Sequence, residues 1–116
     1  MPNWKGSLDL IQYKIELTEP AAQDLEEIMQ YISGILREPN AAKNLLRAIQ
    51  QELSALHQMP ERHPLIPEDI LPGTAIRRLF VKNYTVFFTV HSASATVTVL
   101  RILYSRRDWR TLLENH

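Results

Sequence analysis

The sequence predicts an α+β fold with elements in the order β-α-α-β-β-β-α: an antiparallel sheet covered by an N-terminal helical hairpin, with a short C-terminal helix. Three observations predict it. Residues 19–58 hold two stretches in which apolar residues recur every three or four positions, as in amphipathic helices. Residues 75–104 hold three short runs rich in β-branched and aromatic residues, separated by turn residues. A single alternating run, QYKIEL at residues 12–17, precedes the helices.

The predicted helical hairpin has recognisable ends. Thr18 stands before Glu19-Pro20, which is typical of an N-cap followed by proline in the first turn. We expect the first helix to end before Pro39, because proline disfavours helical geometry in the residue that precedes it. The second helix is expected from Pro39 or Asn40 to Gln58. The two apolar faces consist of Ala21, Leu25, Ile28, Met29, Ile32 and Leu36, and of Ala42, Leu45, Leu46, Ile49, Leu53 and Leu56.

A proline-rich loop, Met59 to Gly73, separates the helices from the later strands. The short connections between those strands predict an antiparallel meander, and the first strand is expected at a sheet edge beside the third or the last strand. The first turn is expected at Lys82-Asn83, where asparagine tolerates a positive φ. The strands and the last helix are expected at residues 75–81, 84–91, 96–104 and 106–114.

Period-two alternation assigns side chains to the two faces of the sheet. Arg78 is predicted to lie on the face left uncovered by the helices, opposite Leu79 and Val81. In the last strand, strict alternation places Arg101 on one face and both Leu100 and Ile102 on the other. We therefore expect Arg78, Arg101 or both to lie near Arg106 on the concave face.

Length and composition indicate one soluble domain. The chain has 116 residues, of which 45% are hydrophobic, and it contains no cysteine. Residues 12–116 are expected to form the domain, and residues 1–11 a leader whose Trp4 and apolar cluster dock on the body or on a partner. No apolar run is long enough for a membrane span, and no secretory signal is recognisable, so a cytoplasmic protein without membrane contact is expected.

Charge is distributed unevenly along the chain. Residues 1–70 carry 6 Lys/Arg and 11 Asp/Glu, a net charge of −5, whereas residues 71–116 carry 7 and 2, a net charge of +5. This asymmetry predicts a basic surface, unless the two halves neutralise each other in the fold. Its candidate target- or anion-binding residues are Arg77, Arg78, Lys82, Arg101, Arg106 and Arg107, with ion pairing of Arg106 or Arg107 to Asp108 as the structural alternative.

The sequence predicts no metal site and no cofactor. Its four histidines lack recognisable ligand spacing, and three glycines are too few for a nucleotide-binding loop. Trp109 is at helical spacing from Leu112 and Leu113, so we expect it to anchor the last helix rather than to stack on a base. Tyr84 and Tyr104 stand at strand ends. The sequence allows two roles for them, packing in the core or at its rim, or proton donation.

Several stretches together resemble the RelE/ParE superfamily, the toxins of bacterial type II toxin–antitoxin modules. They are TEPAAQDLEEIMQYI, RRLFVKNYTVFFTV and VTVLRILYSRRDW, within a resemblance that covers residues 13–113. It implies a growth-arresting protein held inactive by a cognate antitoxin in a hetero-oligomer. It further implies one of two targets: the ribosome, where RelE-like members cut mRNA without metal, or DNA gyrase, which ParE-like members inhibit.

Residue by residue, the ribonuclease pattern is incomplete. Arg78 and Arg106 match its basic positions, but Thr85 stands where an arginine is expected and Leu112 near the position of a tyrosine. If the chain is a ribonuclease, Arg78, Arg106 and Tyr104 are the candidate catalytic residues, with His91 as another substitute acid or base. The gaps favour the ParE-like mechanism, and an inactive protein-interaction module is a further alternative.

The resemblance also implies a surface for the antitoxin. We expect it to include apolar residues of the first helix, the hairpin tyrosine and the last helix. The candidate antitoxin-binding residues are Leu25, Ile28, Tyr84, Trp109, Leu112 and Leu113.

Overall fold

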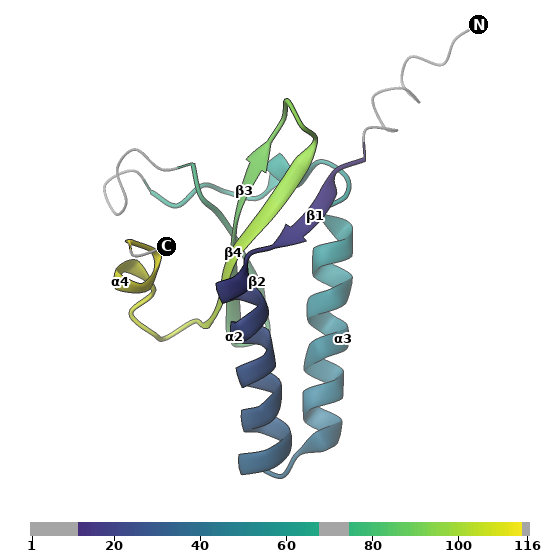
Figure 1. Cartoon of the computed structure of the whole chain (residues 1–116), viewed down its shortest axis with the longest axis vertical. Coiled ribbons are helices and arrows are strands. Elements are labelled where there is room, and N and C mark those ends of the chain that lie inside the picture. Colours follow the sequence, from purple (N-terminus) through teal and green to yellow (C-terminus); the bar gives the residue numbers. More distant parts are fainter. Residues whose placement is uncertain (1–11, 68–74, 115–116) are drawn as a thin grey trace, which may run out of the picture.

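A computed structural model describes residues 12–67 and 75–114 of the chain. It contains a four-stranded sheet in the order β1-β4-β3-β2 and a helical hairpin along one face (Figure 1). The predicted order of elements is confirmed; the predicted leader, residues 1–11, lies outside the described residues. The elements are β1 (Lys14–Leu17), α2 (Glu19–Gln30), η1 (Tyr31–Ile35), α3 (Pro39–Ala55), η2 (Pro60–Arg62), β2 (Arg77–Val81), β3 (Tyr84–His91), β4 (Thr96–Tyr104) and α4 (Trp109–Glu114).

The sheet is mixed rather than antiparallel throughout. The strands β2, β3 and β4 form the predicted meander, and β1 lies at the edge beside β4, as predicted, but runs parallel to it. Parallel neighbours need a long connection, which the helical hairpin and the following strands supply here. Among the described residues, no helix is long and apolar enough to cross a membrane.

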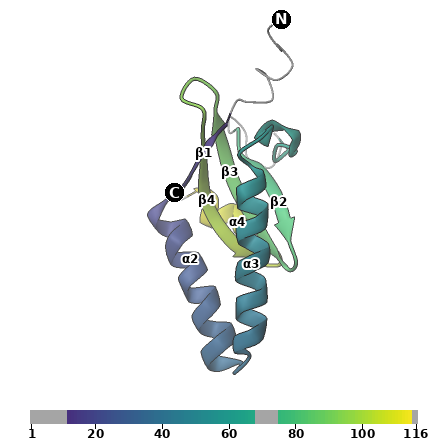
Figure 2. The ribbon, with the colours of Figure 1, turned by 90° about the vertical axis from the view of Figure 1, so that its right-hand side faces the viewer.

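The hairpin is tied to the sheet at its start. The hydroxyl of Thr18 accepts a hydrogen bond from the Ala21 N–H (3.2 Å) and donates one to the Leu100 carbonyl of β4 (2.9 Å). The predicted N-cap is therefore confirmed, and it also fixes where α2 begins on the sheet. At the far end α2 passes into the π-helical turn η1, and the tip of the hairpin extends beyond the sheet (Figure 2). The helix α3 begins at the predicted Pro39 and ends at Ala55, three residues before the expected Gln58.

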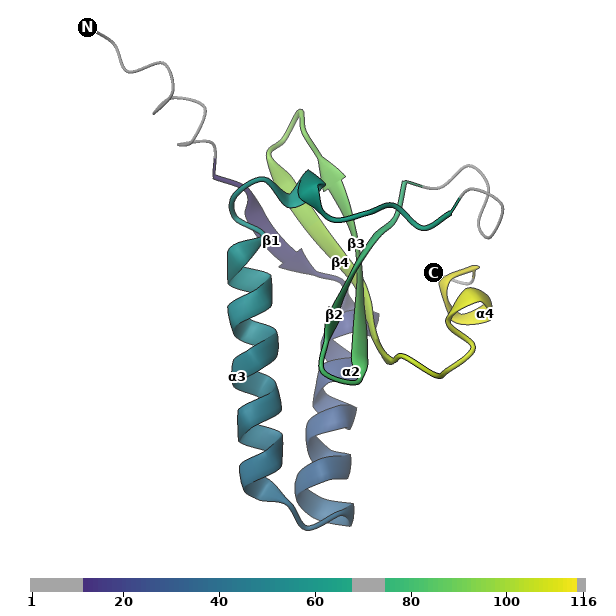
Figure 3. The same cartoon turned by 180° about the vertical axis from the view of Figure 1, so that it is seen from behind.

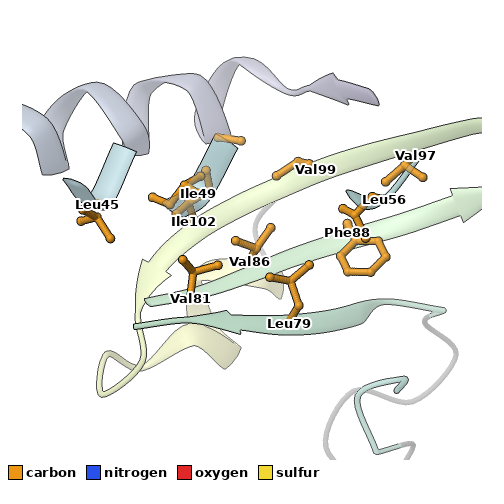
Figure 4. Packing of buried hydrophobic residues seen from close by; sticks show 11 residues of the cluster. Leu45, Ile49, Leu56, Leu79, Val81, Val86, Phe88, Val97, Val99 and Ile102 are labelled. Atoms are coloured by element: carbon orange, nitrogen blue, oxygen red, sulfur yellow. The ribbon is translucent and has the colours of Figure 1, made fainter. Parts of the chain in front are cut away.

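Two apolar cores lie on opposite faces of the sheet. The main core packs the hairpin against the strands, with Ile49 and Val86 at its centre (Figure 4). The second core joins α4 to the other face, where Leu113 packs with the fully buried Phe87. The expectation that this face is uncovered is therefore wrong. Its buried members are Ile66, Ile76, Phe87, Leu100, Leu103 and Leu113, with Trp109 and Leu112 partly buried against them.

A β-bulge in β4 changes the predicted alternation. Phe88 pairs with Val99 and Phe87 with Arg101, so Leu100 has no partner across the ladder. As a result Ile102 joins Val99 in the main core, whereas Leu100 belongs to the second core. The predicted placement of Leu100 and Ile102 on one face is wrong, because strict period-two counting allows no extra residue.

The turn between β2 and β3 lies at the predicted Lys82-Asn83. Its positive φ lies at Lys82 (54°), and Asn83 is not among the residues with positive φ. Lys82 carries this conformation without being glycine, which costs about 1 kcal/mol of backbone strain.

A buried ion pair connects α2 to β4. Asp24 is 7% exposed, and its carboxylate accepts hydrogen bonds from Arg101 Nε (2.7 Å) and Nη2 (2.8 Å). The same carboxylate accepts the backbone N–H of Ile102 (3.0 Å). The hydrogen bond to Asp24 raises the pKa of Arg101 further above its usual value, although burial acts in the opposite direction. Asp24 thus provides a hydrogen-bond acceptor for a backbone N–H of β4 that lies beyond the residues paired with β1.

We predict that Asp24→Asn lowers the free energy of unfolding by about 3 kcal/mol, since it leaves a largely buried guanidinium without a counter-charge. Urea denaturation measures the change. Glu26→Gln, an exposed neighbour on α2, is the matched control and should change stability by less than about 0.5 kcal/mol. The double variant Asp24→Asn/Arg101→Met should recover much of the loss because it removes the unpaired charge. A loss below about 1 kcal/mol for Asp24→Asn would show that the pair is dispensable.

His63 is a second partly buried ionisable group. Its Nε2 is buried without a hydrogen-bond partner, and its ring lies edge-on to Phe88. Burial lowers its pKa below 6.5, and the charge of Arg62 acts in the same direction; Glu52 opposes them, and Arg77 adds a smaller lowering effect. The unfolded chain therefore binds a proton at a higher pH than the folded chain does.

We predict that stability falls as the pH drops through this range. Because the folded-state pKa of His63 is depressed, the unfolded state takes up more protons between that value and about 6.5. The free energy of unfolding, measured by urea denaturation from about pH 7.5 to pH 5, should decrease less steeply in His63→Leu than in the unmodified chain. Equal slopes would contradict the assignment to His63.

Candidate functional site

A cleft of about 900 Å³ lies between the helical hairpin and one end of the sheet. One wall comes from α2, η1 and the start of α3, and the other from the β2–β3 turn, the end of β4 and the segment after it. Figure 3 shows how the hairpin helices α2 and α3 lie relative to β2, β3 and β4. We call it the tyrosine groove. Its lining residues are Asp24, Glu27, Ile28, Tyr31, Ile32, Leu36, Glu38, Ala41, Asn44, Leu45, Lys82, Asn83, Tyr84, Ile102, Leu103, Tyr104 and Arg107.

Three tyrosines give the groove its aromatic surface. The rings of Tyr84 and Tyr104 meet edge to face with centres 5.7 Å apart, and Tyr31 and Tyr104 are 49% and 40% exposed. Burial raises the pKa of Tyr84, and the neighbouring Tyr104 and Tyr31 add to the effect. The Tyr84 hydroxyl is therefore neutral at physiological pH, and it can form hydrogen bonds but is poorly suited to act as a base.

The walls of the groove carry opposite charges. Glu27 and Glu38 lie on the hairpin side, and Lys82 and Arg107 on the sheet side. Asp24 also lines the groove, but its carboxylate is already bound to Arg101. The groove is thus lined by buried apolar residues, such as Leu45 and Ile102, and has negative charge on one wall and positive charge on the other.

A cluster of different composition lies on the opposite face of the sheet. The Arg78 guanidinium carbon is 5.6 Å from the centre of the Phe80 ring and 5.9 Å from that of Trp109. Trp109 in turn packs on Phe87, with ring centres 5.4 Å apart. These are cation–π distances, so Arg78 stabilises the docking of α4 while Phe80 remains 63% exposed.

The predicted basic residues are distributed over several places. Lys82 and Arg107 line the groove, and Arg106 is exposed in the segment between β4 and α4. Arg77 Nη1 donates hydrogen bonds to the carbonyls of Glu61 (3.0 Å) and His63 (2.7 Å). Arg101 and Arg78 both pair with Phe87, so β3 lies between them, and the Arg101 guanidinium is bound to Asp24 of α2. The structure therefore does not gather all six onto one surface.

Asp108 has a role that sequence reasoning missed. Its carboxylate accepts hydrogen bonds from the hydroxyl (2.8 Å) and the backbone N–H (3.5 Å) of Thr111, so it caps α4. The sequence signal was present, since an Asp three residues before a Thr at a helix start is a usual capping pattern. The groove residues Tyr31, Glu27 and Glu38 were also missed, because an amphipathic pattern does not show which edge of a helix borders an opening.

The positions implied by the ribonuclease resemblance are occupied as follows. Thr85 is 3% exposed, and its hydroxyl is 2.8 Å from that of Ser105. Leu112 packs against the second core. Tyr104 is exposed at the groove, whereas His91 lies at the other end of β3, where it pairs with Thr96.

The residues predicted to bind an antitoxin fall on two faces. Ile28 and Tyr84 line the groove, and Leu25 packs partly buried against the main core. Trp109, Leu112 and Leu113 belong to the second core, and Leu113 is 1% exposed. Across residues 12–67 and 75–114, no three His, Cys, Asp or Glu side chains are arranged to hold a metal ion.

The chain is similar to known toxins in sequence and in fold. The family model of the ParE toxin of the type II toxin–antitoxin system parDE matches residues 15–109. No curated protein matches significantly. The solved structure of the chromosomal ParDE system from P. aeruginosa superposes with a TM-score of 0.64 at 22% identity, covering 80% of this chain and 96% of that one.

Two further solved structures share the fold. The RelBE2 toxin–antitoxin complex from Mycobacterium tuberculosis has a TM-score of 0.56 at 18% identity, covering 82% of this chain and 93% of that one. The archaeal RelE–RelB complex from Pyrococcus horikoshii OT3 has a TM-score of 0.56 at 18% identity, covering 83% and 98%. These likenesses establish the fold, and the family model covers most of the chain. The protein therefore belongs to the ParE toxins of type II toxin–antitoxin systems.

Proposed function

We propose that this protein arrests bacterial growth by inhibiting DNA gyrase in the cytoplasm and is neutralised by a cognate antitoxin. Its family supports the role of toxin. The similar structures from P. aeruginosa, Mycobacterium tuberculosis and Pyrococcus horikoshii are a toxin–antitoxin system and two toxin–antitoxin complexes. They support an antitoxin partner that binds this chain in a hetero-oligomer.

The observation that carries the choice of target is the environment of Thr85. Metal-independent RNA cleavage needs a base, an acid and positive charge beside the phosphate. RelE-like ribonucleases, by the resemblance, carry an arginine where Thr85 stands. Here the side chain is buried and bonded to Ser105, so this position holds the start of β3 to the segment after β4. It offers no charge to a phosphate.

The other ribonuclease positions support the same conclusion. Leu112 contributes packing where a tyrosine is expected, and the Arg78 guanidinium lies against Phe80 and Trp109. Of the described imidazoles, His57 Nδ1 contacts the Tyr13 carbonyl (2.7 Å), His91 contacts Thr89 (3.0 Å) and His63 lies edge-on to Phe88. None of these contacts involves Arg106. A protein target needs no such acid–base pair.

One observation favours ribosome-dependent RNA cleavage as the second candidate. Tyr104 is 40% exposed, and both Tyr104 and Arg107 line the groove, so a phenol and a guanidinium border the same opening. A phenol there could protonate a leaving oxygen while the arginine binds the phosphate.

We predict that the purified protein abolishes DNA supercoiling by gyrase. It should leave mRNA intact in an in vitro translation mixture that contains ribosomes. Relaxation of DNA by topoisomerase I is the control and should be unaffected. After induction in cells, thymidine incorporation should fall before methionine incorporation. Cleaved mRNA with normal supercoiling would reverse the choice of target, and no effect in either assay would favour an inactive interaction module.

We predict that Tyr104→Phe retains toxicity within about threefold, judged by the inducer concentration that stops growth. The variant removes only the hydroxyl, and a general acid or base contributes about 10²–10⁴-fold to a rate. Arg106→Ala is tested in parallel, because a ribonuclease needs its charge. A loss of toxicity of about 100-fold or more in both variants, with their thermal unfolding unchanged, would support the ribonuclease.

A further inference from the structure

Four exposed basic side chains form a strip beside one end of the sheet. The segment after β4 is held next to the β2–β3 turn, because the Ser105 N–H donates a hydrogen bond to the Asn83 carbonyl (2.8 Å), and Figure 3 shows the two side by side. Arg107 lines the tyrosine groove with Lys82 and a second, shallow hollow with Arg110, so it connects the two openings. We call the four residues the basic strip: Lys82, Arg106, Arg107 and Arg110.

The positive charge of the basic strip is available to a partner. Ion pairs among residues 12–67 and 75–114 involve none of its members. Asp108 lies within the strip, but both oxygens of its carboxylate are hydrogen bonded to Thr111. The strip therefore presents guanidinium and ammonium groups that the described part of the chain does not pair.

The other basic residues of the C-terminal half are already bound. Arg77 donates hydrogen bonds to two backbone carbonyls, and Arg101 is bound to Asp24. Arg78 lies over the rings of Phe80 and Trp109. The excess positive charge of residues 71–116 that can reach an external anion is thus concentrated in the basic strip.

The composition of the strip favours a phosphate backbone over exposed bases. Arginine binds phosphate with two parallel hydrogen bonds. A protein that binds single strands also needs aromatic rings on which bases stack. The two aromatic residues that flank this segment each pack on another ring: Trp109 on Phe87, with centres 5.4 Å apart, and Tyr104 on Tyr84, with centres 5.7 Å apart. A duplex, whose bases are already stacked, requires only the charges.

We propose that the basic strip binds the backbone of the duplex DNA that gyrase holds, while other surfaces of the chain contact the enzyme. The inference rests on the proposed function, which supplies a target already bound to DNA. Phosphate contacts carry no sequence information, so the strip acts wherever gyrase is bound. The net charge of the whole chain is zero, so its binding to free DNA is weak, and the DNA contact adds to the contact with gyrase.

The test measures binding of the full chain to gyrase alone and to gyrase assembled on a linear duplex. In the variant Arg106→Gln/Arg110→Gln, the strip loses two charges that lie outside the tyrosine groove. The matched control, Lys43→Gln/Arg47→Gln, removes two exposed charges of α3 and gives the same net charge. Thermal unfolding verifies that both variants are folded, and the Kd is measured at several salt concentrations.

We expect the unmodified chain and the control to bind gyrase on DNA about tenfold more tightly than gyrase alone. For Arg106→Gln/Arg110→Gln this gain should shrink to about threefold or less, because two phosphate contacts are lost. The slope of log Kd against log salt, measured with DNA present, should decrease in magnitude by about 2 in the same variant.

Other outcomes would overturn the inference. If DNA does not strengthen binding to gyrase, or if the variant and the control behave alike, the DNA contact fails while gyrase remains the target. An equal loss of affinity with and without DNA would assign Arg106 and Arg110 to the protein surface of gyrase. Stronger competition by a single strand than by the duplex would assign the strip to unpaired nucleic acid. If the unmodified chain binds gyrase under neither condition, the proposed function fails and this inference with it.

Discussion

The edge of β4 is the constraint on which the rest of the structure depends. β4 is nine residues long, but β1 pairs with its first part only, so its outer edge needs other partners beyond Val99. Thr18 satisfies the Leu100 carbonyl, and Asp24 satisfies the Ile102 N–H while binding Arg101. An unpaired buried backbone group costs about as much as a lost hydrogen bond. The start of α2 is therefore fixed against β4, and the hairpin follows from there.

This attachment also creates the groove. The far end of the hairpin extends past the end of the sheet, as Figures 1 and 2 show. The side chains of Ile28 and Ile32 then border an opening whose other side is the β2–β3 turn. One buried ion pair thus supports both the fold and one wall of the candidate binding site.

The two faces of the sheet have different roles. The hairpin face carries the main core and ends in the tyrosine groove, while the opposite face holds α4 through Trp109 and the cation–π contacts of Arg78. The charged segment that joins β4 to α4 connects the two: Arg107 borders the groove, and Asp108 caps α4. Basic residues close together in sequence therefore serve separate surfaces.

The sequence by itself determined the order of elements, the Thr18 cap, the start of α3 at Pro39 and the anchoring of α4 by Trp109, because these depend on local periodicity, capping and proline geometry. It also contained the residues of the family resemblance. Only the tertiary structure decided that Leu100 and Ile102 part at a bulge, that Arg101 binds Asp24 rather than an external anion, and that Lys82 and Arg107 face Glu27 and Glu38 across a groove. Arg101 and Asp24 alone are 77 positions apart, and pairings over such a distance follow from packing, which leaves no periodic signal in the chain.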